Sequence, residues 1–218
     1  MLSYLRAMTD ALITAEKLLQ ANAVQLNPQQ PFTWASGWKS PIYCDNRSIL
    51  SQPYIRDYIK SELCNVAFEQ FGEADLIAGV ATAGIAWGAM VADQLKLPFI
   101  YVRPKPKEHG LGNQIEGQFT KGQKTIVIED LISTGKSSLQ VVEVLRQNGL
   151  GIAGMISIFN YQFDVARKSF EDASVKYFSL TSYPDLISLA STKGIIRQED
   201  EQVLLKWRSD PANWKGLS

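Results

Sequence analysis

The segment TIVIEDLISTGKSS, from Thr125 to Ser138, gives the clearest indication of the fold. It begins with an apolar, mostly β-branched run that is typical of a buried strand in a parallel sheet. An acidic pair, Glu129 and Asp130, follows the run and precedes a short polar loop. After the loop, an amphipathic pattern leads to Asn148-Gly149, which is a typical helix stop. The stretch therefore predicts a strand, a tight loop and the N-terminus of a helix.

The predicted loop has the composition of a phosphate-binding site. Backbone N–H groups of such a loop, together with the positive end of the helix dipole, point at one anion. Hydroxyl groups add donors, and the loop supplies those of Ser133, Thr134, Ser137 and Ser138. The sequence matches neither the Walker A pattern nor the glycine-rich dinucleotide pattern. An ordinary strand-to-helix turn with an N-cap is the alternative interpretation.

The acidic pair distinguishes this loop from a simple phosphate cradle, because negative charges repel a phosphate. Glu129 and Asp130 fit a phosphate that is attached to a sugar, since carboxylates accept hydrogen bonds from sugar hydroxyls. A hard cation between the carboxylates and the ligand is the other explanation. The residues alone leave both explanations open.

Val127 to Gly135 resembles, in order, the phosphoribosyl pyrophosphate (PRPP) motif of the type I phosphoribosyltransferases, in which apolar residues, two acids and a loop of Thr, Gly and Ser succeed one another. The resemblance implies an α/β fold, with an open parallel sheet flanked by helices, a Rossmann-like core and an N-terminal hood. It also implies a set of PRPP-binding residues in this stretch: Glu129, Asp130, Leu131, Ile132, Ser133, Thr134, Gly135, Lys136 and Ser137.

The rest of the chain predicts further strand-to-helix units. We expect strands at 76–80, 99–102, 151–160 and 175–180, and helices at 3–22, 54–71, 85–95, 183–190 and 200–207. Short connections between them indicate an open parallel sheet, with the ligand at the carboxyl ends of the strands. The small residues at 81–84 let a ligand approach the backbone closely, and the resemblance places pyrophosphate there.

An aromatic segment at 32–47 precedes the core, with a predicted hairpin over 33–38. From the pattern alone, it is either a wall for a planar ligand or a hairpin that covers a core edge. The segment resembles the F-T-x-x-S-G-x-K-S-P-x-Y hood of the orotate phosphoribosyltransferases, although Ala35 stands where some members carry lysine. The resemblance implies that the following residues contact orotate: Ser36, Gly37, Tyr43 and Ser133. Some members hold the orotate carboxylate with an arginine, which is absent from 159–162, so we expect hood amides and Ser133 to serve.

A basic, glycine-rich loop at 103–117 contains the only histidine of the chain. Prolines and glycines disfavour a helix or regular strand, so the loop is either a mobile lid over a polyanion or a solvated basic loop. It resembles the catalytic loop R-x-x-x-K-(D/E)-H-G of the same family. Five residues match this pattern by position: Arg103, Lys107, Glu108, His109 and Gly110. The resemblance adds Arg103, Lys105, Lys107 and His109 to the PRPP contacts, with Lys105 in place of a lysine that some members carry at Pro104.

Length and composition bound the class of protein. The chain has 218 residues, 45% apolar and 20% charged, which predicts a single domain over 1–218: helix and hood at 1–50, core at 51–180, helices and tail at 181–218. The net charge of zero favours neither nucleic acid nor an anionic membrane as a partner. Two cysteines are too few for a disulfide scaffold, which favours a cytoplasmic protein. The uncharged run at 76–92 is rich in Ala and Gly, which favours close packing over a membrane span.

The resemblance implies an enzyme that transfers the phosphoribosyl group of PRPP to N1 of orotate in pyrimidine biosynthesis. It implies catalytic roles for Glu129, Asp130, Lys107 and His109, and a Mg²⁺ ion held mainly by PRPP without direct protein ligands. It further implies a homodimer whose lid loops reach into the neighbouring site. A purine or xanthine phosphoribosyltransferase and a non-enzymatic regulator of the same fold are the alternatives. The hood and the lid pattern argue against the first, and the neutral charge with its intact acidic pair argues against the second.

Overall fold

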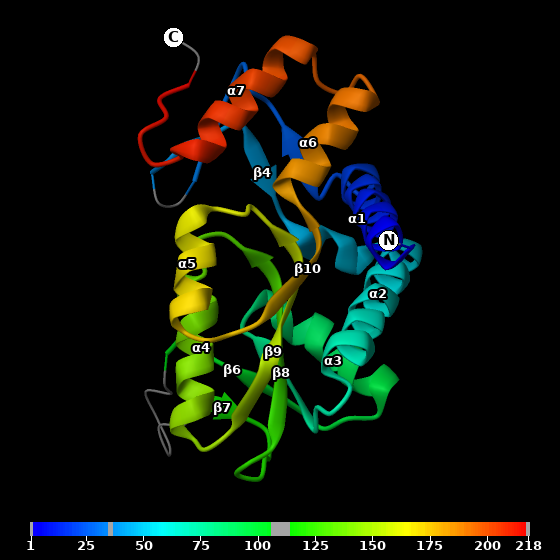
Figure 1. Ribbon diagram of the computed structural model, residues 1–218, viewed down its shortest axis with the longest axis vertical. Coiled ribbons are helices and arrows are strands. Elements are labelled where there is room, and N and C mark those ends of the chain that lie inside the picture. The colour runs from blue at the N-terminus through cyan, green and yellow to red at the C-terminus, as the bar shows by residue number, and fades with distance from the viewer. Residues whose placement is uncertain (1, 35–36, 106–113, 217–218) are drawn as a thin grey trace. The chain divides into compact units, whose positions relative to one another are not determined.

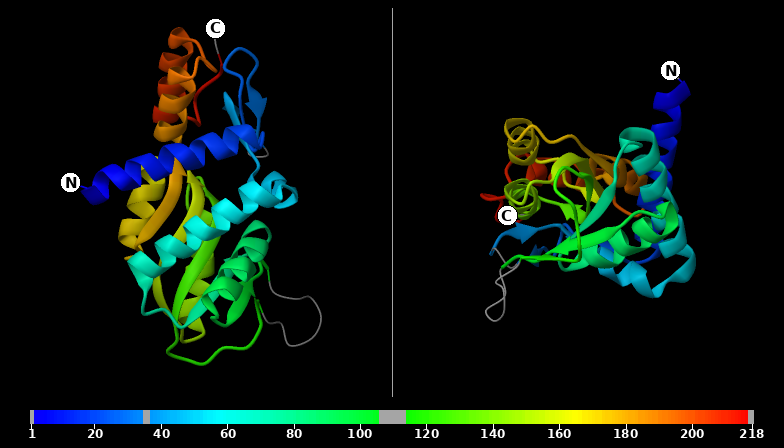
Figure 2. Two further views of the ribbon diagram at one scale, coloured as in Figure 1. Left: turned by 90° about the vertical axis from the view of Figure 1, so that its right-hand side faces the viewer. Right: turned by 90° about the horizontal axis from the view of Figure 1, so that it is seen from below.

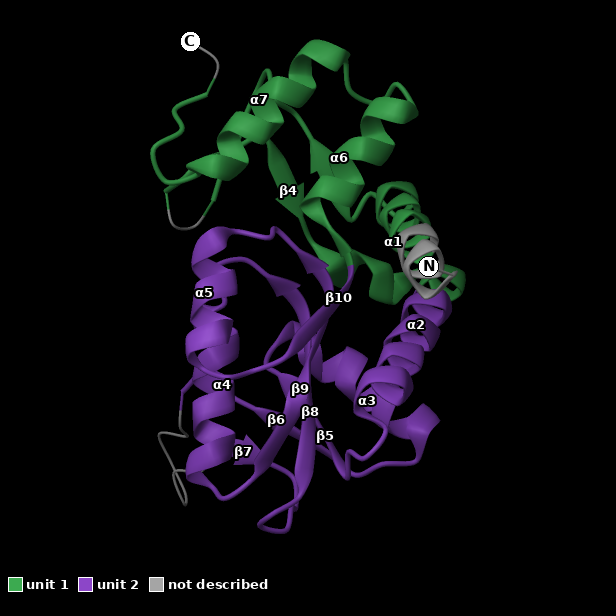
Figure 3. Cartoon of the chain, in the orientation of Figure 1, with its two compact units in different colours: residues 1–55, 181–218 green, residues 56–180 purple. Residues whose placement is uncertain are grey.

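The fold is that of a computed structural model, which describes residues 2–34, 37–105 and 114–216 (Figure 1). The contacts within the chain divide it into two compact units (Figure 3). Unit 1 comprises residues 1–55 and 181–218, and unit 2 comprises residues 56–180. Each unit has its own secondary structure and is described separately.

Unit 2 is built on a six-stranded sheet with the order β10-β9-β8-β5-β6-β7. Its strands are β5 (Leu76–Val80), β6 (Phe99–Val102), β7 (Ile115–Glu116), β8 (Lys124–Ile132), β9 (Gly151–Asn160) and β10 (Tyr177–Ser182). β9, β8, β5 and β6 are parallel, and β7 at the edge pairs antiparallel with β6. The predicted open parallel sheet is therefore confirmed, with β8 inside it.

Helices cover both faces of this sheet. α2 (Pro53–Phe71) and α3 (Ala83–Leu95) lie on one face, and α4 (Lys136–Gln147) and α5 (Asp164–Asp172) lie on the other (Figure 1). Because helices cover both faces, every position of β8 from Thr125 to Glu129 is buried, instead of buried and exposed positions alternating along the strand. The core between the sheet and its helices includes Val127, Ile132, Val142, Leu145 and Phe170.

Glycines bring α3 unusually close to the central strands. A Cβ atom on Gly84 would lie 2.4 Å from the carbonyl oxygen of Ile128 in β8. A Cβ atom on Gly79 in β5 would lie 2.6 Å from the Gly84 oxygen. The small residues of the uncharged run at 76–92 thus allow close contact of α3 with β5 and β8. None of the helices in the described ranges is both long and apolar enough to cross a bilayer.

Unit 1 contains α1 (Leu2–Gln20), α6 (Tyr183–Thr192), α7 (Gln198–Ser209), the short helix η1 (Asn46–Ser51) and two antiparallel strand pairs. α1 packs on α6, and α6 packs on α7. Figures 1 and 2 show these helices side by side. β1 (Val24–Leu26) pairs with β4 (Ile42–Cys44), and β2 (Phe32–Thr33) pairs with β3 (Lys39–Ser40). The second pair confirms a hairpin in this segment, although its strands, at 32–33 and 39–40, lie mostly outside the predicted range 33–38.

The structure differs from the sequence-based expectation in several places. β8 continues through the acidic pair to Ile132, because its pairing with β9 extends to Ile132 opposite Asn160. β10 begins at Tyr177 instead of 175. The segment at 103–117, for which no regular strand was expected, contains β7, and α5 was not predicted at all.

Candidate active site

The turn between β8 and α4 leaves the N-terminus of α4 without a side-chain cap. Gly135 holds the N-cap position with φ +78°, and the first helical bond runs from the Leu139 N–H to the Gly135 carbonyl at 2.9 Å. A Cβ atom on Gly135 would also lie 2.8 Å from the ring of Phe170. Glycine is therefore required both by the backbone conformation and by the neighbouring ring. The N–H groups of the first turn are left for an external acceptor.

The side chains of this loop are available to the same acceptor. Ser133 and Thr134 are half-buried, and Lys136 and Ser137 are exposed. Within the described ranges, the structure gives none of these four side chains a hydrogen-bond partner. Hydroxyl and N–H donors around one helix N-terminus form a suitable site for a phosphate group.

Ser138 does not share in this site, contrary to the sequence-based expectation. Its side chain is buried, and its hydroxyl donates a hydrogen bond to Glu129 Oε2 at 3.2 Å. The other carboxyl oxygen, Glu129 Oε1, accepts the Asp130 N–H at 3.0 Å. The expectation was wrong because Ser138, in the first turn of α4, lies on the side that packs against β8.

The two members of the acidic pair have different surroundings. Glu129 is only 6% exposed, whereas Asp130 is half-buried. Burial, and after it the neighbouring Asp130 charge, raises the pKa of the Glu129 carboxyl well above its ordinary value of 4.5. The pair thus presents one accessible carboxylate, that of Asp130, at the carboxyl end of β8.

A second strand-loop-helix unit ends at the same edge of the sheet. β5 runs parallel to β8, and its loop at Ala81-Thr82 leads into α3, where Thr82 makes no side-chain cap hydrogen bond. The sequence predicted that small residues here admit a ligand, and this stays a prediction. The structure shows that one of them, Gly84, lies against the backbone of β8. This packing places the N–H groups of the first turn of α3 beside the strand that carries the acidic pair.

The stem of the predicted lid also begins at this edge. The Arg103 N–H donates to the Gln114 carbonyl at 2.9 Å, and Gln114 Nε2 donates to the Arg103 carbonyl at 2.8 Å. The Arg103 guanidinium lies 3.7 Å from the Glu116 carboxylate, and Lys105 is exposed. The other predicted lid residues, Lys107, Glu108, His109 and Gly110, lie outside the described residues.

The predicted hood is an aromatic cluster within unit 1. Trp34 contacts Trp207 edge to face at 5.7 Å between ring centroids, and the two indole N–H groups donate to the carbonyls of Ile42 and Lys39. Tyr43 stays 41% exposed beside Phe32, and Gly37 has φ +85°. Several aromatic residues therefore hold the hairpin itself, and Tyr43 is open to a ligand. Ala35 and Ser36 lie outside the described residues.

The segment after β9 lies beside the phosphate loop. The Tyr161 N–H donates to the Ile132 carbonyl at 3.1 Å, and the Gln162 N–H donates to Asn160 Oδ1 at 2.7 Å. The nearest arginine along the chain, Arg167, is exposed and pairs with Glu171 at 3.0 Å. The structure thus identifies no arginine in this segment that is poised for a carboxylate ligand.

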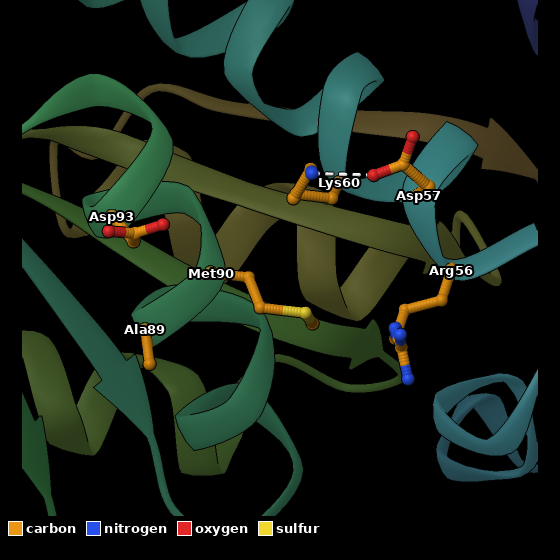
Figure 4. A pocket seen from close by; sticks show the side chains of 6 residues that line it. All are labelled: Arg56, Asp57, Lys60, Ala89, Met90 and Asp93. Carbon is orange, nitrogen blue, oxygen red and sulfur yellow. Dashed lines mark hydrogen bonds and ion pairs between the residues drawn. The ribbon is translucent and has the colours of Figure 1, made fainter. Parts of the chain in front are cut away.

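Two surface pockets lie away from these loops. One, of about 320 Å³, is lined by Arg56, Asp57 and Lys60 of α2 and by Ala89, Met90 and Asp93 of α3 (Figure 4). The Lys60 ammonium and the Asp57 carboxylate are 2.5 Å apart there. The other, of about 480 Å³, lies at the amino ends of β8 and β9, around Lys124 and Gly151. Among the residues that the structure describes, no three His, Cys, Asp or Glu side chains gather as metal ligands.

Known proteins are similar to this chain in architecture and in sequence. The family described as phosphoribosyl transferase domain matches residues 48–183. The orotate phosphoribosyltransferase of Phocaeicola vulgatus is 52% identical over 201 residues, 92% of this chain and 95% of the relative. That of Listeria innocua is 52% identical over 200 residues, 92% of this chain and 96% of the relative. The crystal structure of orotate phosphoribosyltransferase from Aeropyrum pernix has a TM-score of 0.73 and 28% identity, and the match covers 84% of this chain and 99% of that one.

Proposed function

This chain belongs to the orotate phosphoribosyltransferase family, and we propose that it transfers the 5-phosphoribosyl group of PRPP to N1 of orotate. The products are orotidine 5′-monophosphate and pyrophosphate, so the reaction is a step of pyrimidine (UMP) biosynthesis. One observation carries the proposal. Hydrogen-bond donors of the β8–α4 loop that have no described partner surround the N-terminus of α4, and the loop follows the half-buried Asp130 in the chain.

The β8–α4 loop supports binding of the 5′-phosphate of PRPP. The N–H groups of the first turn of α4 and the hydroxyls of Ser133, Thr134 and Ser137 are donors without a described partner. The acidic pair then lies at the level of the ribose, where Asp130 accepts hydrogen bonds from the ribose hydroxyls. Loss of pyrophosphate leaves positive charge on the sugar ring, which a nearby carboxylate stabilises in a site closed to water.

The pyrophosphate group binds at the second loop and under the lid. The N–H groups at the start of α3 are suitable donors, because they lie at the same sheet edge as the acidic pair. In this proposal, Arg103, Lys105, Lys107 and His109 neutralise the leaving group from the lid. Orotate lies under the hood, with Tyr43, Ser36, Gly37 and Ser133 as its contacts.

A Mg²⁺ ion is part of the proposed reaction. A hard cation prefers oxygen ligands, and Asp130 is the accessible carboxylate at this edge. We propose that PRPP oxygens hold the ion and that Asp130 contacts it only through the bound substrate. When bound, the ion neutralises charge on the pyrophosphate.

The proposed enzyme is a homodimer in which the lid of one subunit completes the site of the other. Lys107→Ala damages the lid and Asp130→Asn damages the phosphoribosyl site. Mixed dimers of these two variants regain one intact site if the lid is shared. Mixed dimers that stay as inactive as their parents would contradict lid sharing.

The activity is tested by the loss of orotate absorbance near its ultraviolet maximum. We expect the loss to require both PRPP and Mg²⁺. Two controls, each without one of these components, check this requirement. Adenine, guanine and xanthine are offered in parallel. Turnover of one of these purines with no turnover of orotate would overturn the proposal in favour of a purine phosphoribosyltransferase.

A further inference from the structure

We propose that α7 holds the hairpin of β2 and β3 in position for orotate, with Trp207 as a positioning residue for the pyrimidine side of the site. The inference rests on the proposed function, in which this hairpin is part of the hood over orotate. It gives a role to a C-terminal helix that the sequence pattern predicts without assigning it one. The hairpin and α7 both belong to unit 1 (Figure 3), and the inference is carried by the contacts between them.

The hairpin is too short to fix its own position. β2 and β3 have only two residues each, paired in antiparallel register. The Trp34 N–H adds one further bond, to the Trp38 carbonyl at 2.9 Å. An isolated two-stranded hairpin is at best marginally stable in water, so a hairpin of this size depends on the elements that pack against it. A ligand wall built on it therefore needs support from elsewhere in the chain.

The buried side of α7 supplies this support. The buried residues of the helix, Asp200, Leu204 and Trp207, recur at helical spacing and form one stripe. The Trp207 indole N–H donates to the Lys39 carbonyl in β3 at 3.1 Å. The Trp207 ring also meets the ring of Trp34 edge to face, a favourable geometry for an aromatic pair. One side chain of α7 thus contacts the chain on both sides of the hairpin turn.

The other end of the same stripe holds the segment that leads into the hairpin. Gln29 Nε2 donates to Asp200 Oδ1 at 3.0 Å. The Arg197 guanidinium fixes this carboxylate, since it donates to both oxygens, at 2.9 Å and 3.0 Å. Asp200 is only 6% exposed, so these bonds are largely shielded from water. α7 therefore holds the chain on both sides of β2, at Gln29 and at Trp34.

The position of the hairpin sets the aromatic wall proposed for orotate. Phe32 in β2 lies beside Tyr43, with 5.7 Å between the ring centroids, and Tyr43 is the exposed ring that the proposed function assigns to orotate. Displacement of a positioning element by about 1 Å is enough to weaken the productive binding of a substrate. The proposed PRPP contacts lie in the loops after β8 and β5 and in the lid. Support from α7 therefore bears on orotate and not on PRPP.

The first test is Trp207→Phe, measured by steady-state kinetics with orotate and PRPP. The substitution keeps an aromatic ring and removes the donor to the Lys39 carbonyl. We expect the KM for orotate to rise by about fivefold, the equivalent of one neutral hydrogen bond, while the KM for PRPP changes by less than about twofold. An unchanged KM for orotate, or an equal rise of both KM values, would overturn the inference.

Tyr183→Phe is the matched control for this test. Tyr183 is a fully buried aromatic residue of unit 1, and its hydroxyl donates to a main-chain carbonyl, that of Leu204 within α7, at 2.9 Å. The variant loses a bond of the same kind, so we expect lower stability with both KM values unchanged. A rise of the KM for orotate as large as that of Trp207→Phe would show a general effect of lost stability and would overturn the role of Trp207.

The second test leaves the buried residues untouched and compares two neighbouring glutamines. Gln29 and Gln30 are both exposed, but the Gln30 side chain has no hydrogen-bond partner among the described residues, whereas that of Gln29 donates to Asp200. We expect Gln29→Ala to raise the KM for orotate by about threefold and Gln30→Ala to leave it unchanged. Equal KM values for orotate in the two variants would show that α7 does not position this segment.

A third measurement does not depend on turnover. Hydrogen exchange of the Trp34 amide should be at least about fivefold faster in Trp207→Phe than in the parent protein, and unchanged in Tyr183→Phe. Unchanged exchange in Trp207→Phe would overturn the positioning role, even if the parent protein converts orotate. If the parent protein fails to convert orotate, the proposed function fails, and the amide exchange still decides whether α7 holds the hairpin.

Discussion

The β8–α4 loop and the β5–α3 loop end at the same edge of one sheet, but they offer a ligand different groups. The first loop carries an accessible carboxylate, hydroxyls and a helix N-terminus. The second carries small residues and a helix N-terminus, and Gly84 presses against β8. In the proposed function, side chains and backbone of the first loop both contact the ligand. In the second loop only the backbone is proposed to contact the ligand, and Gly84 packs against β8.

This contrast shows that similar supersecondary units acquire separate tasks through their side chains. A loop with distinct polar groups discriminates among parts of a ligand, because each hydrogen bond demands its own partner. A loop that offers only N–H groups accepts any suitably placed anion. The proposed sugar phosphate and pyrophosphate sites fit these two modes.

The largest expected effect comes from Asp130→Asn, which tests the side-chain half of the contrast. We expect kcat/KM for PRPP to fall by about 100-fold to 1,000-fold, because the carboxylate that stabilises the charged sugar ring is gone. Steady-state kinetics with orotate measure the loss, and circular dichroism checks that the variant folds. A fall of less than about tenfold would show that Asp130 is not the ribose ligand.

Gly84→Ala tests the second part of the contrast, the close packing of the β5–α3 unit against β8. The added Cβ would lie 2.4 Å from the Ile128 oxygen, so α3 or β8 must move. We expect the free energy of unfolding to fall by about 1–3 kcal/mol in urea denaturation, the usual cost of overpacking. Gly151→Ala is the control, because the nearest atom to its Cβ is 3.6 Å away and its conformation is ordinary. Equal stability of the two variants would contradict the close contact.

Ser133→Ala and Thr82→Ala compare hydroxyls in the two loops. We expect Ser133→Ala to raise the KM for PRPP by about tenfold, since it removes a donor to a charged phosphate. Thr82→Ala should raise it by less than about threefold, because the Thr82 side chain makes no cap hydrogen bond and the proposed binding there uses the backbone. A larger effect of Thr82→Ala than of Ser133→Ala would reverse the contrast.

The pH dependence of stability isolates the contribution of Glu129. Because the pKa of Glu129 is raised in the folded chain, the folded chain keeps a proton that the unfolded chain loses above an ordinary pKa of 4.5. The free energy of unfolding therefore falls as the pH rises above that value, by up to about 1.4 kcal/mol per pH unit from this group, until the raised pKa is passed.

Glu129→Gln lacks this contribution, so its stability relative to the parent protein should increase with pH across the same window. Urea denaturation of both proteins between about pH 5 and about pH 8 measures the difference. Parallel stability curves would show that Glu129 is ionised in the folded chain. The β5–α3 loop has no acidic residue and adds nothing to this dependence.

The sequence predicts those parts of the molecule that depend on local pattern. The bounds of β5, β6 and β9 follow from apolar runs between turn residues, and the observed strands have the predicted limits. The PRPP motif locates the β8–α4 loop, because the spacing of acids, hydroxyls and Gly135 is itself the local chemistry. Such features need no knowledge of what packs against them.

Features that depend on a distant partner escaped prediction. Ser138 looked like one more loop hydroxyl, and only the packing of α4 on β8 turns it toward Glu129. The acidic pair looked like part of a loop, and only pairing with β9 keeps it in a strand. The helical spacing of Ala166 and Phe170, both buried, is the signal that would have revealed α5. Gly84 gave no local sign that the backbone of β8 lies against it.

The closed stem of the lid has a consequence for how this enzyme can vary. Arg103 and Gln114 join the chain to itself with two hydrogen bonds, next to the pairing of β6 with β7. These two bonds close the connection at 104–113 between β6 and β7. Doubling the length of a flexible connection costs only about 0.6 kcal/mol of closure entropy. Natural drift and laboratory selection can therefore lengthen, shorten or exchange this segment while the core keeps its stability, so that the chemistry of the lid can evolve independently of the fold.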